Sequence, residues 1–140
     1  MQQKPIPSQF TFRLGYLATP YSKYPGGIDA AFHAAAMLAA RLLRAGYVAY
    51  SPIAHTHPIA MHGGIDPLAH AIWLPFDAEM MRVCDALLVA TLPGWDESRG
   101  VREEISCFEQ ARKPVYLLNP DGLKITRHLD ACLGDNVYGY

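Results

Sequence analysis

Apolar runs and amphipathic stretches alternate along the chain and predict an order of strands and helices. The run Ala86 to Ala90 is short, continuous and apolar, as expected for a strand covered on both faces in a parallel sheet. Residues 10–18, 47–51 and 114–118 predict three more strands. Between the strands predicted at residues 10–18 and 47–51 lies a segment rich in strong helix formers, with Asp29 as its expected cap and a glycine at its end. The opening of the chain therefore predicts a β-α-β unit.

Another helix is predicted after the loop that follows Ala90. At about 100° per residue, Glu104 falls inside its apolar arc, whereas Glu103 points to water. A carboxylate one turn into such a helix points toward the carboxyl end of the sheet, where open α/β folds bind ligands. A lone acid there would be interpreted as a border residue paired with an arginine. The arc itself consists of Val101, Ile105, Phe108 and Ala111.

Another acid is predicted on a buried face in the segment before Ala86. Asp66 and Pro67 indicate a helix start, and Pro75 is expected to interrupt that helix and begin a second segment that ends near Cys84. Asp77 lies inside the apolar arc of the second segment. That arc consists of Phe76, Met80, Val83 and Cys84.

Together these elements predict an α/β fold: a doubly wound, flavodoxin-like parallel sheet of four to five strands with helices on both faces. We expect one domain over residues 1–140, in which residues 1–9 form a flexible leader. Residues 52–66 are expected to form a long, histidine-rich loop. The tail after residue 118 predicts no more than one short strand or helix.

Composition narrows the classes of partner. A net charge of -1 without a basic run disfavours polymeric nucleic acid and anionic membranes as partners. Cys84, Cys107 and Cys132 are widely spaced and form no CxxC pair, which indicates reduced thiols. With no membrane-spanning run and no signal peptide, we expect a soluble, cytoplasmic protein.

Three short motifs in this order resemble the nucleoside 2-deoxyribosyltransferase superfamily. They are Tyr16-Leu-Ala-Thr-Pro20, Asp77 eight residues before Asp85, and Ser98-x-Gly100-Val-x-x-Glu104. The resemblance covers residues 16–118 and is nearest to small bacterial members of undefined function, close to the nucleotide N-hydrolase branch.

The resemblance implies a role for each matching residue. Glu104 takes the place of the nucleophile that attacks the anomeric carbon and forms a glycosyl-enzyme ester. Asp77 takes the place of the acid that contacts the departing base and passes a proton to it. Tyr16 matches a tyrosine that orients the nucleophile, and Tyr21 lies where an aromatic residue borders the base.

Five further residues complete the expected substrate site. Deoxyribosyltransferases usually carry an acid at the place of Ser98, whereas a serine there is similar to the N-hydrolase branch, in which it helps to hold a 5′-phosphate. An ordinary helix N-cap is an equally good interpretation of Ser98. The others are Thr19 and Gly100 from the motifs, His55 beside sugar or phosphate, and Trp95 beside the ligand or a neighbouring subunit.

These residue types suit cleavage of an N-glycosidic bond, which needs a carboxylate below the sugar and a proton donor beside the base. The expected partner is a small-molecule nucleoside or nucleoside 5′-monophosphate. Hydrolysis and transfer to another base share one intermediate and stay open. No cofactor is required. The resemblance also implies a homodimer or a larger homo-oligomer.

Two other classes of function stay open. The histidines His55, His57 and His62, with His70 and Asp66, offer metal ligands for a metal-dependent hydrolase, although their spacing matches no HExxH-type signature. A non-catalytic nucleotide sensor on the same fold is the other alternative. A sensor could dispense with Glu104, and an enzyme could not.

Overall fold

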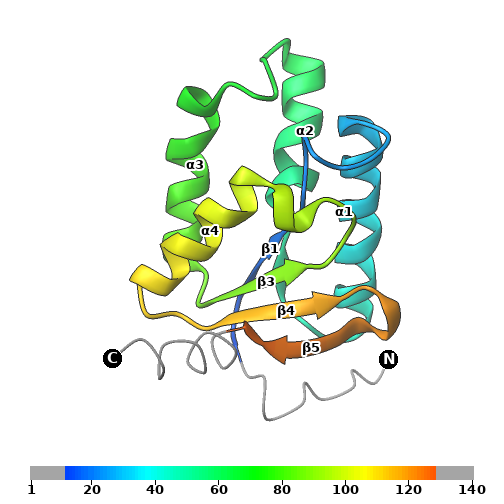
Figure 1. Ribbon diagram of the computed structural model, residues 1–140. Coiled ribbons are helices and arrows are strands. Elements are labelled where there is room, and N and C mark those ends of the chain that lie inside the picture. The colour runs from blue at the N-terminus through cyan, green and yellow to red at the C-terminus, as the bar shows by residue number, and fades with distance from the viewer. Residues whose placement is uncertain (1–11, 129–140) are drawn as a thin grey trace.

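Five strands form one sheet in the order β2-β1-β3-β4-β5 (Figure 1). The computed structural model describes residues 12–128. Neighbouring strands from β2 to β4 are parallel, and β5 runs antiparallel to β4 at the edge. The predicted α/β fold is therefore confirmed; the tail after residue 118 supplies one short strand, whose antiparallel direction the sequence pattern did not predict. The strands are β1 (Gly15–Ala18), β2 (Ala49–Tyr50), β3 (Ala86–Ala90), β4 (Val115–Asn119) and β5 (Lys124–Arg127).

Within residues 12–128, four α-helices surround the sheet: α1 (Ile28–Arg44), α2 (Pro52–Gly63), α3 (His70–Val83) and α4 (Arg99–Gln110). Short 3-10 turns lie at Trp95–Glu97 and Asp121–Leu123. In Figure 1, α2 and α3 form a hairpin whose connection lies at the top of the molecule. The strands predicted at 47–51 and 10–18 are shorter than expected, and residues 10 and 11 lie outside the described part.

Alternate residues of the central strands face two separate cores. Leu17 and Leu88 pack with Leu38 and Leu42 of α1 on one side of the sheet. Tyr16, Leu87 and Val89 pack with residues of α3 and α4 on the other side, including Met81, Val101 and Phe108. Burying a side chain such as Phe108 contributes roughly 1.5–3 kcal/mol. The sheet is thus covered on both faces, which explains why all five residues of β3 are buried.

The prediction of a long loop at residues 52–66 is wrong, because most of this segment forms helix α2. Ser51 caps this helix by accepting a hydrogen bond from the Ala54 N–H at 3.2 Å, and Pro52 occupies the first helical position. Gly64 ends it in a left-handed conformation (φ 66°). Pro58 lies inside the helix and conceals its helical character in the sequence.

The predicted break at Pro75 is also wrong, since α3 continues through that residue. Pro75 lies in the second turn, where its missing N–H removes a single backbone hydrogen bond. The predicted start at Asp66-Pro67 is three residues early. Phe76 and Val83, expected on the buried arc, are 39% and 50% exposed, because α4 and the sheet cover only the opposite side of α3.

The predicted helix arc of α4 is confirmed for Val101 and Phe108, which are buried, and for half-buried Ile105. Ala111 is exposed, because it lies just beyond the helix end. Trp73 is half-buried and donates its indole N–H to the Asp66 carbonyl at 2.9 Å.

Some expectations fall on parts of the chain that the structure does not describe. The leader at residues 1–9 and Cys132 lie outside residues 12–128. Within those residues Cys84 and Cys107 are free thiols. None of the described helices combines the length and the hydropathy that crossing a bilayer requires.

Candidate functional site

Strand pairing and two helices bring four polar side chains together on the α4 side of the sheet. Tyr16 of β1 pairs in register with Tyr50 of β2, and their ring centroids are 5.8 Å apart. Phe108 of α4 packs 5.9 Å from the Tyr16 ring on another side. Glu104 from α4 and Asp77 from α3 both act electrostatically on the Tyr16 hydroxyl. The three residues predicted to be catalytic therefore lie together.

Glu104 lies in a setting that disfavours its charge. Burial is the largest cause that raises the pKa of its carboxyl to about 8; the Tyr16 hydroxyl opposes the rise, and the negative charges of Asp77 and Glu103 add to it. The pKa of Tyr16 is in turn raised far above its usual range, first by burial and then by Glu104. Glu104 is therefore mostly protonated at neutral pH in the free protein.

Asp77 is the more readily ionised of the two acids. Burial raises the pKa of its carboxyl to about 6, while the nearby His55 lowers it. The His55 ring stacks on Phe76 with centroids 5.1 Å apart and lies 6.2 Å from the Tyr50 ring. Helix α2 thus places His55 at the edge of the acid pair, and its contact with sugar or phosphate stays a prediction.

Several buried polar atoms around the acids have no hydrogen-bond partner. Tyr16 Oη, Tyr50 Oη and Asp77 Oδ1 are buried without a partner that meets normal length and angle limits. The Tyr16 hydroxyl still lies close enough to Glu104 to lower the pKa of its carboxyl. Buried polar atoms are nearly always satisfied by protein, water or ligand. This cluster therefore has the unmet hydrogen-bonding capacity of a ligand site.

Two residues predicted to bind substrate follow β1 directly. Thr19 is buried, and its hydroxyl also lacks a partner. Tyr21 is half-buried, with its hydroxyl 2.5 Å from Nδ1 of His57. Nε2 of His57 lies 3.0 Å from the carboxylate of Asp29. Asp29 was predicted to cap α1, but Gly27 takes that position and Asp29 is in the first turn.

The predicted residues of the β3-α4 connection have mixed placements. Ser98 is the N-cap of α4, because its hydroxyl accepts a hydrogen bond from the Val101 N–H at 3.3 Å. Gly100 is exposed in the first helical turn. Trp95 is half-buried and packs against the core that contains Tyr16. The cap accounts for Ser98, and contact with a 5′-phosphate stays a prediction.

The histidines do not gather around one point. His55 faces Tyr50 and Phe76, whereas His57 faces Tyr21 and Asp29 from another side of the same helix. His62 is exposed in the last turn of α2. Nowhere in residues 12–128 do three His, Cys, Asp or Glu side chains form a group able to hold a metal ion.

Sequence reasoning missed Tyr50 and the partners of His57. Tyr50 belonged to an apolar strand and showed no motif; only the pairing with Tyr16 reveals its position. Asp29 and His57 are 28 positions apart, and no spacing rule links them. The available signal was weaker: one tyrosine in each of the neighbouring strands β1 and β2.

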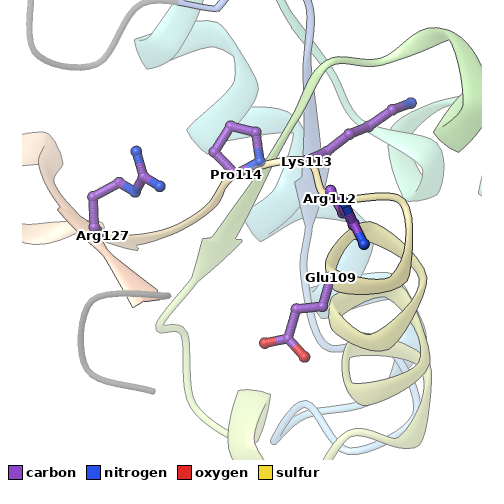
Figure 2. Close-up of a pocket in the computed structure, with 5 residues that line it drawn as sticks. All are labelled: Glu109, Arg112, Lys113, Pro114 and Arg127. Atoms are coloured by element: carbon purple, nitrogen blue, oxygen red, sulfur yellow. The ribbon is translucent and has the colours of Figure 1, made fainter. Parts of the chain in front are cut away.

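A separate hollow lies at the opposite, amino end of the sheet (Figure 2). Its basic side chains suggest an anion site, but Nζ of Lys113 already donates to the carbonyls of Met81, Arg82 and Cys84, at 3.0, 2.7 and 2.7 Å. The Arg127 guanidinium lies over the Tyr116 ring. The hollow is therefore unrelated to the acid pair. It is lined by Glu109, Arg112, Lys113, Pro114 and Arg127.

Comparison with known proteins identifies a family for most of the described chain. Residues 13–119, which include β1 to β4 and the acid pair, match the family model named Domain of unknown function (DUF1937). A search of curated proteins finds no match. Because the match covers more than half of the sequence, this chain belongs to the DUF1937 family.

Proposed function

We propose that the protein cleaves the N-glycosidic bond of a nucleoside, deoxynucleoside or nucleoside 5′-monophosphate, through a glycosyl-enzyme intermediate on Glu104. The cluster of buried polar atoms without partners around two acids, Tyr16 Oη, Tyr50 Oη and Asp77 Oδ1, carries the proposal. Glu104 is in the helix that follows β3. This fold places ligands beside the carboxyl ends of the strands, where such a helix begins.

The proposed reaction needs each acid in a defined protonation state. The Glu104 carboxylate attacks the anomeric carbon as the bond from that carbon to the base nitrogen breaks, and the proton of Asp77 passes to the departing base. Water or a second base then attacks the anomeric carbon, gives its proton to the Asp77 carboxylate and releases the Glu104 carboxylate. Water yields a hydrolysis product, and a second base yields an exchanged nucleoside.

The pKa values favour the reverse distribution of the proton in the free protein. Glu104, with the higher pKa, holds a proton more tightly than Asp77 does. The form that has ionised Glu104 and protonated Asp77 is therefore a minor form of the protein at pH 7. Positive charge that develops on the sugar in the transition state stabilises ionised Glu104, so this minor form suffices for catalysis.

The same protonation favours one alternative, a nucleotide-binding protein without catalysis. A protonated Glu104 donates a hydrogen bond and can hold a neutral ligand without attacking it. This alternative requires the unsatisfied atoms near Tyr16 to bind a ligand that is released unchanged.

The decisive experiment compares the wild-type protein with Glu104→Gln on a panel of nucleosides and 5′-monophosphates, with and without an acceptor base. Free base released without acceptor indicates a hydrolase, and exchange only with acceptor indicates a transferase. We expect Glu104→Gln to lower turnover by about a thousandfold or more, since the nucleophile is lost. Equal turnover by the variant contradicts the proposal. Ligand binding without turnover by either protein supports the alternative.

We also propose that the protein works as a homodimer or a larger homo-oligomer. Ile72, Phe76 and Val83 recur at helical spacing along α3, and they are 53%, 39% and 50% exposed. A stripe of large apolar side chains on one helix is typical of a contact surface. Cytoplasmic location stays a prediction.

A further inference from the structure

Tyr21, His57 and Asp29 form a hydrogen-bonded chain that the proposed chemistry does not use. The Tyr21 hydroxyl lies 2.5 Å from Nδ1 of His57, and Nε2 lies 3.0 Å from Oδ1 of Asp29. The His57 ring stacks on Phe32 with centroids 4.6 Å apart, and the Tyr21 ring meets it edge-on at 5.7 Å. The imidazole is buried, whereas the Asp29 side chain is 88% exposed. Contacts on all sides hold the imidazole in one orientation.

When the His57 imidazole is neutral, this geometry sets the direction of both hydrogen bonds. An ionised carboxylate only accepts, so in the neutral imidazole the proton must lie on Nε2. Nδ1 then accepts, and the Tyr21 hydroxyl must donate its single proton to it. The oxygen of Tyr21 keeps only lone pairs for any other partner. A tyrosine hydroxyl can ordinarily donate or accept a hydrogen bond. Toward any further partner, Tyr21 can therefore only accept.

The half-buried Tyr21 ring stands at the ligand end of the sheet. It follows Thr19 and Pro20 at the carboxyl end of β1, and the Thr19 hydroxyl has no partner. The loop that carries Tyr21 lies against the loop before Trp95: a Cβ on Gly94 would be only 2.4 Å from the Lys23 carbonyl oxygen. Helix α2 links both systems, since it carries His55 beside Asp77 and His57 beside Tyr21.

We propose that the Asp29–His57 pair fixes Tyr21 as a hydrogen-bond acceptor that selects ligands whose base carries an N–H donor, such as an exocyclic amine. The inference rests on the proposed function for its substrate class. Tyr21 is the specificity residue, and His57 and Asp29 are positioning residues. A role for Tyr21 as a nucleophile is disfavoured, because burial and then Asp29 raise the pKa of its hydroxyl to about 12.

The test compares kcat/KM for matched substrates: a purine nucleotide with the amine and the analogue without it. We expect the wild-type protein to prefer the amine by tenfold or more, because the analogue leaves the Tyr21 oxygen without a donor. Tyr21→Phe and His57→Phe keep an aromatic ring and should reduce the preference to within about twofold. Tyr24→Phe, in the same loop, is the matched control and should retain it. Equal kcat/KM for both substrates in the wild-type protein overturns the inference.

Two further measurements separate this inference from the proposed function. If no nucleotide is cleaved, calorimetry can still measure the binding of free adenine and free purine. Tighter binding of adenine that Tyr21→Phe abolishes supports the acceptor role of Tyr21. Equal binding of the two bases, or no binding of either, refutes that role. A matched pair that differs in the 2′-hydroxyl tests a sugar donor, and a preference confined to that pair also refutes the base-selecting role. Nitrogen-15 NMR of labelled histidine should show Nδ1 of His57 unprotonated, and a proton on Nδ1 contradicts the hydrogen-bond direction.

Discussion

The two acids at positions 77 and 104 differ in what their surroundings do to their charge. Burial acts on both, but Glu104 also faces the charges of Asp77 and Glu103, while Asp77 has His55 beside it. The protonation of the pair thus depends on one exposed histidine and on the hydroxyl of Tyr16. The difference between the two pKa values comes from neighbouring side chains, so single substitutions can test it.

The pH dependence of kcat/KM should be bell-shaped if Glu104 is the nucleophile and Asp77 the proton donor. Activity needs Asp77 protonated and Glu104 ionised, so the limbs should lie near the pKa values of about 6 and about 8 for the coupled pair. The measurement is kcat/KM from pH 4.5 to 9.5. A profile that rises through pH 8 and does not fall again would remove Asp77 as the donor.

Replacing Glu104 with Gln should stabilise the fold, and more so as the pH rises. The folded protein binds a proton at Glu104 up to about pH 8, whereas a glutamate in the unfolded chain loses it near pH 4.5. Stability from this proton is therefore fully present below pH 4.5 and is lost as the pH rises through about 8. Urea unfolding at pH 4.5 and pH 8.5 should show Glu104→Gln gaining on the order of 2–4 kcal/mol at the higher pH.

Exposed Glu109 on the same helix provides the control for that measurement. Glu109→Gln should leave the pH dependence of the free energy of unfolding unchanged. If Glu104→Gln shows the same dependence as the wild-type protein, the carboxyl of Glu104 does not titrate abnormally.

At the scale of elements, helix α3 depends on a cation supplied from another part of the chain. Lys113, between α4 and β4, donates to three carbonyls at the end of α3 and lies 5.6 Å from the centre of the Phe108 ring. These carbonyls have no partner within the helix. One lysine thereby joins α3 to α4 and to the start of β3.

Lys113→Met should lower the free energy of unfolding by about 1–3 kcal/mol, because the last carbonyls of α3 lose a charged donor. Methionine keeps most of the apolar length of the side chain. The exposed neighbour Arg112 provides a matched control, and Arg112→Met should change stability by less than about 0.5 kcal/mol. Equal effects of the two variants in urea unfolding would contradict the capping role.

The β1-α1 and β3-α4 loops meet at Gly94, where any side chain would collide with backbone. Gly94 has φ 88°, and an added Cβ would lie 2.4 Å from the Lys23 carbonyl oxygen. Gly122 also has a positive φ, of 75°, but open space around it. Gly94→Ala should therefore cost more stability than Gly122→Ala, by about 1–3 kcal/mol. Thermal unfolding of both variants checks this, and equal losses would show that only the backbone conformation matters.

At the scale of the whole molecule, the apolar stripe of α3 predicts self-association. Val83→Glu introduces a charge into the stripe and should shift the protein toward monomer, which light scattering after size exclusion would measure. Leu43→Glu, on α1 and 56% exposed in the wild-type chain, is the control and should leave the assembly unchanged. A wild-type protein that is monomeric at high concentration would contradict the prediction.

The sequence by itself determined the elements whose signal is local. Ala86 to Ala90 form a strand because a short apolar run suits burial on both faces, and Glu104 faces the sheet side of α4 because helical periodicity places it there. The same order of elements predicts that a ligand would bind at the carboxyl end of the sheet. Helix α2 escaped prediction because Pro58 and its polar residues weaken the periodic signal.

Only the tertiary structure decided which side chains meet. Tyr50 reaches Tyr16 through the register of β1 and β2, and His57 reaches Tyr21 and Asp29 because α2 packs against α1. The exposure of Phe76 and Val83 likewise depends on which side of α3 the sheet covers. Such contacts join residues tens of positions apart, and their energies depend on burial and distance, which no local pattern of residues encodes.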